Sequence, residues 1–184
     1  MVKDTGNRKQ FKSGALSDIY EGKGRCDLIP LRVMSMYFYY EAQHRCKPLS
    51  TRLYIASNVL TDLQNYIDDG DLTHIVHALE NFSDVFKIEG IDISSPEMFL
   101  EVSHHYEDGA KKYAPRNWEK GIPVSCNIDS CIRHLLKWIR GDNDERHDRA
   151  VVWRLLAVLY MNMKYSNDPD ICDIERVGYE GENT

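Results

Sequence analysis

Apolar side chains recur at helical spacing through the first half of the chain. Residues 31–45 are dense in apolar and aromatic side chains and predict a buried helix. Ser57 or Asn58 is a suitable cap for a second helix that ends near Asp69, where a glycine follows. Residues 72–86 place apolar side chains on one face and predict a third helix.

The second half of the chain predicts three more helices. Residues 96–113 begin with a serine cap and a proline in the first turn, which is a strong start signal. Asn127 or Asp129 is expected to cap the next helix, and Gly141 to end it. The last helix is expected to begin at residues 142–144 and to continue through the apolar run that follows.

These elements predict an all-α protein. Only residues 87–95 alternate like a strand, and one short segment cannot build a sheet, so it is a connector or an isolated strand. The polar, glycine-punctuated residues 1–30 are expected to form a flexible N-terminal arm, with closure over an anionic ligand as the alternative. The 184 residues, 42% of them hydrophobic, are expected to fold as a single domain, with a loosely ordered tail over residues 166–184.

Charge and cysteine usage exclude several functions. The formal net charge of −6 argues against non-specific binding to nucleic acid or to an anionic membrane. Five cysteines, an odd number without a CxxC pair, and the lack of a secretory leader indicate a reduced, cytoplasmic protein. No apolar run approaches the roughly 18 residues that a membrane span needs.

Candidate chemistry begins on the helix predicted over residues 96–113. One stripe of this helix carries Glu101, His105, Asp108 and Lys112, and the neighbouring stripe carries His104, Glu107 and Lys111. The alternative is a solvated helix laced with ion pairs, such as Glu107 with Lys111.

The next two predicted helices add further polar groups. Arg133 is suited to bidentate phosphate contact, and His134 is its neighbour. Glu145-x-x-Asp148 is expected to put two carboxylates on one helix face, where they can hold a divalent cation. Mg²⁺ or Mn²⁺ at such a site suits a triphosphate, so the residues permit a metal-dependent phosphoanhydride hydrolase.

Three other interpretations stay open. His147-Asp148 is an HD dipeptide, which permits an HD-type dNTP triphosphohydrolase. The charged helices also permit a non-catalytic helical adaptor. His74 and His77 lie one helical turn apart, a spacing that can bind metal, but no carboxylate or cysteine accompanies them in the sequence, which favours surface histidines.

Several blocks of the chain resemble the phage dATP/dGTP diphosphohydrolase family (MazZ-type). The blocks are His105-Tyr106-Glu107-x-Gly109-Ala110-x-Lys112-Tyr113, Arg116-Asn117-Trp118-Glu119-Lys120-Gly121, Asp129-Ser130-x-x-Arg133-His134, and Asp144-Glu145-x-His147 ahead of Trp153. Ser13-Gly14-Ala15 and Lys23-Gly24-Arg25-x-Asp27-Leu28-x-Pro30 resemble the N-terminal signature of that family. About residues 37–96 have no counterpart and are interpreted as a helical insertion.

The resemblance implies a MazG-like helical bundle, often oligomeric, that uses Mg²⁺ or Mn²⁺ to hydrolyse a purine dNTP to dNMP and pyrophosphate. In phages that replace adenine by 2-aminoadenine, such an enzyme supplies dGMP and trims the competing pool. The implied catalytic residues are Glu107 and Glu145, and the implied further metal ligands are Glu101, His105, Asp144, His147 and Asp148. The implied substrate contacts are Lys23, Arg25, Lys111, Lys112, Asn117, Trp118, Arg133 and His134.

Overall fold

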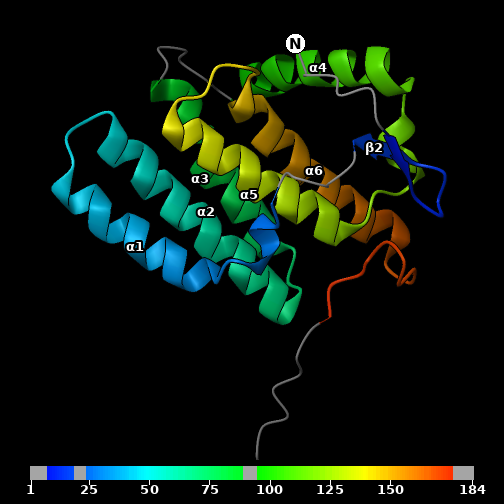
Figure 1. The fold of residues 1–184 in the computed structure, drawn as a ribbon, viewed down its shortest axis with the longest axis horizontal. Helices are drawn as coiled ribbons and strands as arrows, with labels where there is room; N and C mark the ends of the chain where they lie inside the picture. The colour runs from blue at the N-terminus through cyan, green and yellow to red at the C-terminus, as the bar shows by residue number, and fades with distance from the viewer. Residues whose placement is uncertain (1–7, 19–23, 89–94, 176–184) are drawn as a thin grey trace, which may run out of the picture.

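Helices make up most of the described chain, which comprises residues 8–18, 24–88 and 95–175 of a computed structural model (Figure 1). In order they are α1 (Leu31–His44), α2 (Leu49–Asp69), α3 (Thr73–Ile88), α4 (Ser95–Tyr113), α5 (Val124–Arg140) and α6 (His147–Tyr165). Two 3-10 turns, η1 (Cys26–Leu28) and η2 (Asn117–Lys120), and an antiparallel hairpin of β1 (Arg8–Gln10) and β2 (Leu16–Asp18) complete the described elements. The all-α class is confirmed.

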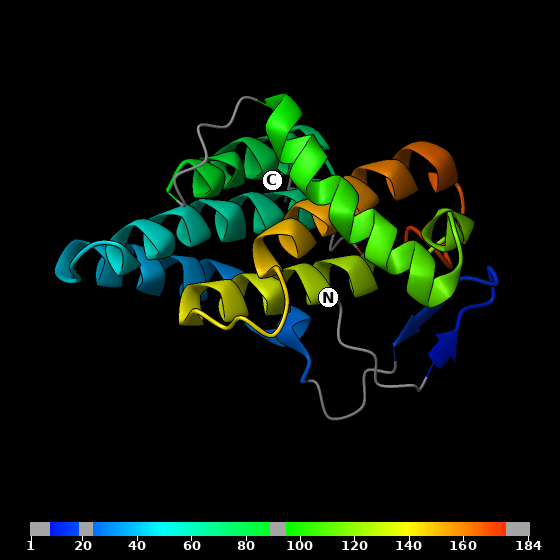
Figure 2. The ribbon, with the colours of Figure 1, turned by 90° about the horizontal axis from the view of Figure 1, so that it is seen from above.

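The helix α6 lies at the centre of the packing. It contacts α3, α4 and α5, while α2 packs against α1, α3 and α5 (Figures 1 and 2). Phe82 of α3 meets Trp138 of α5 edge to face, with ring centroids 5.3 Å apart. The fully buried side chains of this core include Val59, Leu63, Ile75, Ile132, Leu135, Leu155 and Val158. In Figure 2, α4 crosses over α6.

The helices α1, α3 and α4 have nearly the predicted limits, whereas α2 begins earlier than predicted. Its first residue is Leu49, so Ser57 and Asn58 are not caps. The hydroxyl of Ser57 is buried and donates to the carbonyl of Tyr54 at 2.7 Å, which satisfies the hydroxyl inside the helix. Of the predicted connector at 87–95, residues 89–94 lie outside the described part.

The start of α5 also differs from the prediction, because its cap comes from the far end of the chain. The N–H of Val124 donates to the carbonyl of Ile171 at 2.8 Å, and the N–H of Ser125 donates to Oδ1 of Asp173 at 2.8 Å. Asn127 and Asp129 therefore lie buried inside the helix rather than at its cap. The described tail residues, 166–175, are thus held against α5.

The described part of the N-terminal segment is docked on the helices. The N–H of Leu16 donates to Oδ1 of Asn117 at 3.1 Å, and the amide nitrogen of Asn117 donates back to the carbonyl of Leu16 at 2.9 Å. Lys112 and Tyr113 of α4 each donate to Asp18 at 2.9 Å. These contacts bring β2 to the end of α4 (Figure 2).

No helix within the described residues is both long and apolar enough to cross a membrane.

A pair of glycine substitutions tests the packing of the tail. Gly121 has a φ of +107°, and a Cβ there would overlap the side chain of Ile171. Gly121→Ala should lower the free energy of unfolding by about 1 to 3 kcal/mol. Gly109, inside α4 with open space around it, is the matched control, and Gly109→Ala should raise that free energy by about 0.5 to 1 kcal/mol. Urea unfolding measures both, and equal effects would contradict the packing described here.

Candidate active site

The segment between α5 and α6 places two carboxylates at one end of the helix pair. Gly141, at a φ of +86°, ends α5 as predicted, but α6 begins only at His147. The prediction that the last helix starts at residues 142–144 is therefore wrong. Lys137 donates to Asp144 at 3.2 Å, which ties the segment back to α5, so Asp144 and Glu145 precede the helix.

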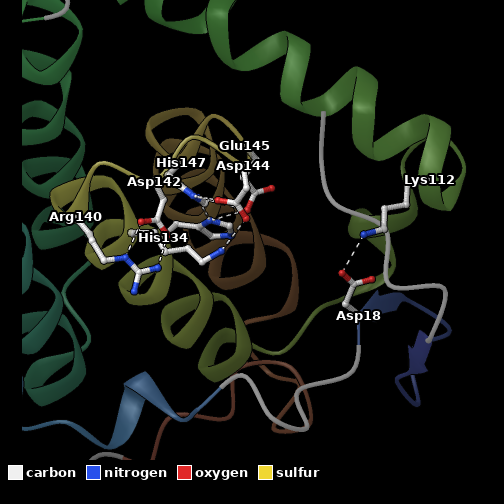
Figure 3. A network of polar contacts seen from close by, with 9 residues as sticks. Asp18, Lys112, His134, Arg140, Asp142, Asp144, Glu145 and His147 are labelled. Carbon is white, nitrogen blue, oxygen red and sulfur yellow. Dashed lines mark hydrogen bonds and ion pairs between the residues drawn. The ribbon is translucent and has the colours of Figure 1, made fainter.

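Three donor atoms converge where this segment meets α5 (Figure 3). Nδ1 of His134 lies 3.0 Å from Nδ1 of His147 and 3.2 Å from Oε1 of Glu145. Nδ1 of His147 lies 3.4 Å from the same oxygen. Neighbouring ligands around a divalent ion with bonds of about 2.1 Å have this spacing, so the residues fit a metal ion. We call His134, Glu145 and His147 the donor triangle.

A further carboxylate orients one histidine of the donor triangle. Oδ1 of Asp144 lies 2.9 Å from Nε2 of His147. With the proton of His147 on Nε2, Nδ1 keeps a lone pair that faces the triangle, as in the carboxylate–histidine arrangement around many metal ions. Asp144, Asp142 and His147 are also close enough to hold an ion between them.

The pKa values of the two histidines in the donor triangle shift in opposite directions. Burial lowers the pKa of His134 to about 3, so this imidazole is neutral at pH 7. Burial also opposes the charge on His147, but hydrogen bonds to Glu145 and Asp144 outweigh it and raise the pKa of His147. Although burial opposes its charge too, the hydrogen bond to His147 helps to bring the pKa of Glu145 to about 2. At pH values below its raised pKa, His147 carries a proton that a metal ion would have to displace.

Two members of the donor triangle, His134 and Glu145, line a cavity of about 630 Å³. His147 and Glu145 line a second cavity of about 400 Å³, so the donor triangle lies where the two cavities meet. Tyr106, Trp118 and Trp153 line the larger cavity with aromatic rings, and the Tyr106 centroid lies 5.6 Å from that of Trp118. His105 also lines the cavity, and burial lowers its pKa to about 4. The cavity thus offers aromatic rings as well as polar groups.

Cationic side chains from α5 and α6 reach the same cavity. Arg133, Lys137 and Arg154 all line it. The guanidinium of Arg154 lies 4.1 Å from the ring centroid of Trp153 and donates to Asn127 at 2.9 Å. Arg154 was missed by the sequence prediction, although it follows His147 by two turns on the same helix face, and that spacing was the available signal.

Several predicted site residues have other partners. Glu107 lines the cavity from α4, but its side chain is 60% exposed and its carboxylate pairs with Lys111 at 2.6 Å. Lys112 is buried and holds Asp18, and both polar ends of the Asn117 side chain hold Leu16.

Other predicted residues are not part of the donor triangle. Asp148 is buried, accepts from Arg146 at 3.0 Å, and lines the cavity of about 400 Å³ together with His147. Glu101 pairs with Arg149 of α6. Arg25 is exposed beside η1, and Lys23 lies outside the described residues.

Fold and site together define an all-α protein with a candidate metal cluster at the edge of a partly aromatic cavity. Residues 83–170 match the family model described as dATP/dGTP diphosphohydrolase, N-terminal. Residues 83–170 are therefore a dATP/dGTP diphosphohydrolase N-terminal domain, and the chain is a nucleotide hydrolase. The matched range contains the whole donor triangle. Comparison with curated proteins and with solved structures gives no match.

The proton on His147 makes metal binding depend on pH. Because the folded-state pKa of His147 is raised, protons compete with the metal ion as the pH falls through that pKa. The affinity for Mn²⁺ should fall by up to about tenfold per pH unit on the acid side of that pKa. Isothermal titration between pH 8 and pH 5.5 measures this, with proton release read from the buffer dependence of the heat. Affinity that is constant over this range would contradict the assigned protonation.

Proposed function

We propose that the chain hydrolyses a purine deoxynucleoside triphosphate, dGTP or dATP, to the monophosphate and pyrophosphate. The reaction would serve phage nucleotide-pool remodelling or 2-aminoadenine synthesis, and the fold would be of the MazG-like kind. The observation that carries the proposal is the donor triangle, of which His134 and Glu145 line the same cavity as Arg133, Lys137 and Arg154. A triphosphate needs such a combination of metal and cationic groups.

The metal ion would be held by His134, Glu145 and His147, with Asp144 orienting His147. A bound divalent ion would polarise the phosphorus and lower the pKa of water. Two imidazole nitrogens and one carboxylate oxygen suit Mn²⁺ better than Mg²⁺, which prefers oxygen ligands alone. We therefore expect Mn²⁺ to support turnover at lower concentration than Mg²⁺.

Other side chains of the cavity would bind the phosphates, stack on the base and orient the attacking water. Arg154, with Lys137, would neutralise phosphate charge, and Trp118 would stack on the purine. Glu107 would orient the attacking water from the opposite helix. The pairing with Lys111 lowers the pKa of Glu107, so this carboxylate is ionised and able to accept a proton from water.

The alternatives receive less support. An HD-type site would need Asp148 beside the metal, but the carboxylate of Asp148 is already paired with Arg146. The family match argues against a non-catalytic adaptor. The reaction products distinguish the two kinds of hydrolase. An HD-type enzyme releases deoxynucleoside and triphosphate, whereas the proposed reaction releases dNMP and pyrophosphate.

Glu145→Gln tests the metal site. It removes a metal-binding charge and should lower kcat for dGTP or dATP by about 100-fold, with a matching loss of Mn²⁺ affinity. Glu80→Gln is the control, because Glu80 is an exposed carboxylate of α3 outside the cavity lining. Anion-exchange chromatography of the products measures turnover. A Glu145→Gln enzyme with kcat within twofold of the control would overturn the site.

Glu107→Gln separates water orientation from metal binding. It should lower kcat by about tenfold or more while leaving the Mn²⁺ affinity unchanged, because Glu107 is not part of the donor triangle. Unchanged kcat would show that Glu107 is a solvated residue that only pairs with Lys111.

We also infer that the chain forms a homo-oligomer through α1. Its outer face exposes Val33, Met36, Tyr37 and Tyr40 at 58 to 73% of their surface, spaced by three and four residues. Val33→Glu with Met36→Glu should convert the assembly to monomers, as measured by light scattering after size exclusion, while Glu80→Gln on the exposed surface of α3 should not. A wild-type chain that is monomeric at tens of micromolar would refute this inference.

A further inference from the structure

A second group of metal-ligand side chains lies between α2 and α3. Asp62 is on α2, and His74 and His77 lie one turn apart on α3; one donor atom of each lies within 4.8 Å of the others. None of the three lines the cavity of the donor triangle. From the sequence alone the two histidines are expected at the surface because no carboxylate accompanies them, but packing of α2 on α3 brings Asp62 to them.

A hydrogen bond already holds the Asp62 carboxylate in place. Oδ2 of Asp62 accepts from the amide of Asn81 at 2.9 Å. Within the described part of the chain, Oδ1 accepts no hydrogen bond and stays available to a ligand. Burial raises the pKa of Asp62, and the nearby His77 and His74 counter that effect. A cation bound between this half-buried carboxylate and the two imidazoles would offset the free-energy cost of burying the carboxylate charge.

One of the histidines is oriented in the same way as His147 in the donor triangle. Nε2 of His74 lies 3.0 Å from Oδ2 of Asp69, so a proton on Nε2 leaves the lone pair of Nδ1 for a metal ion. His77 is exposed, and its ring centroid lies 6.4 Å from that of His74. An exposed side chain can turn to complete the ligand set at little cost.

We propose that Asp62, His74 and His77 form a second metal site, for a divalent transition-metal ion such as Zn²⁺, that clips α2 to α3. Two imidazole nitrogens and one carboxylate oxygen are a zinc donor set, whereas Mg²⁺ and Ca²⁺ require oxygen ligands. The two helices run antiparallel through the turn at Gly70, where a φ of +77° ends α2. The ion would therefore fasten this hairpin, which packs on α5 and α6, and would act independently of catalysis.

Zinc titration of the full chain tests the site, with a chromophoric chelator as the competitor. The His77→Ala variant should bind one zinc ion fewer than wild type. His44→Ala, which removes another exposed helix histidine, should bind the same number as wild type. Asp69→Asn should lower the affinity for the same zinc ion by about 10- to 100-fold, because it removes only the carboxylate that orients His74. Equal zinc number and affinity in His77→Ala and wild type would overturn the proposal.

Thermal unfolding and turnover separate this site from the donor triangle. Zinc should raise the melting temperature of wild type and His44→Ala by more than that of His77→Ala, because an ion bound only to the folded chain stabilises it. The Mn²⁺-dependent turnover of His77→Ala should equal that of wild type. An equal zinc-induced shift in all three proteins would contradict the clip, and lost turnover in His77→Ala would contradict its independence.

Discussion

Two imidazole nitrogens 3.0 Å apart, beside a carboxylate oxygen, are the contact on which the candidate site depends. Polar groups this close and this shielded from water are stable only with a proton or a metal ion between them. Glu145 and Asp144 stabilise the protonated form of His147, which supplies a proton between the groups when no metal ion is bound. Because His134 comes from α5 and His147 from α6, the pairing of these helices has to be accurate to a fraction of an ångström.

The surrounding contacts hold that pairing in place. Ile171 and Asp173 cap α5 from the far end of the chain, and buried Asn127 holds Arg154 at the cavity wall. The hairpin, fixed by Asn117 and Lys112, lines the cavity on another side. The proposed metal and phosphate contacts both come from α5 and α6, whereas the proposed base contact, Trp118, comes from η2.

Periodicity predicted the helices well because their apolar faces are continuous, and it predicted the end of α5 from Gly141. It failed at Asn127 and Asp129, because the partners of the first α5 N–H groups are more than 40 residues away in sequence. The prediction that Glu145 and Asp148 share one helix face is wrong, because α6 begins at His147 and Glu145 precedes it. The donor triangle needs the α5–α6 packing, which local patterns do not contain, although the family blocks did contain its three members.

The position of bound Mn²⁺, located by anomalous diffraction from crystals of the full chain, is the most direct test of the donor triangle. We expect an anomalous peak about 2.1 Å from Nδ1 of His134, Nδ1 of His147 and Oε1 of Glu145. A peak coordinated by Asp148, or a peak with no contact to His134 and His147, would contradict it.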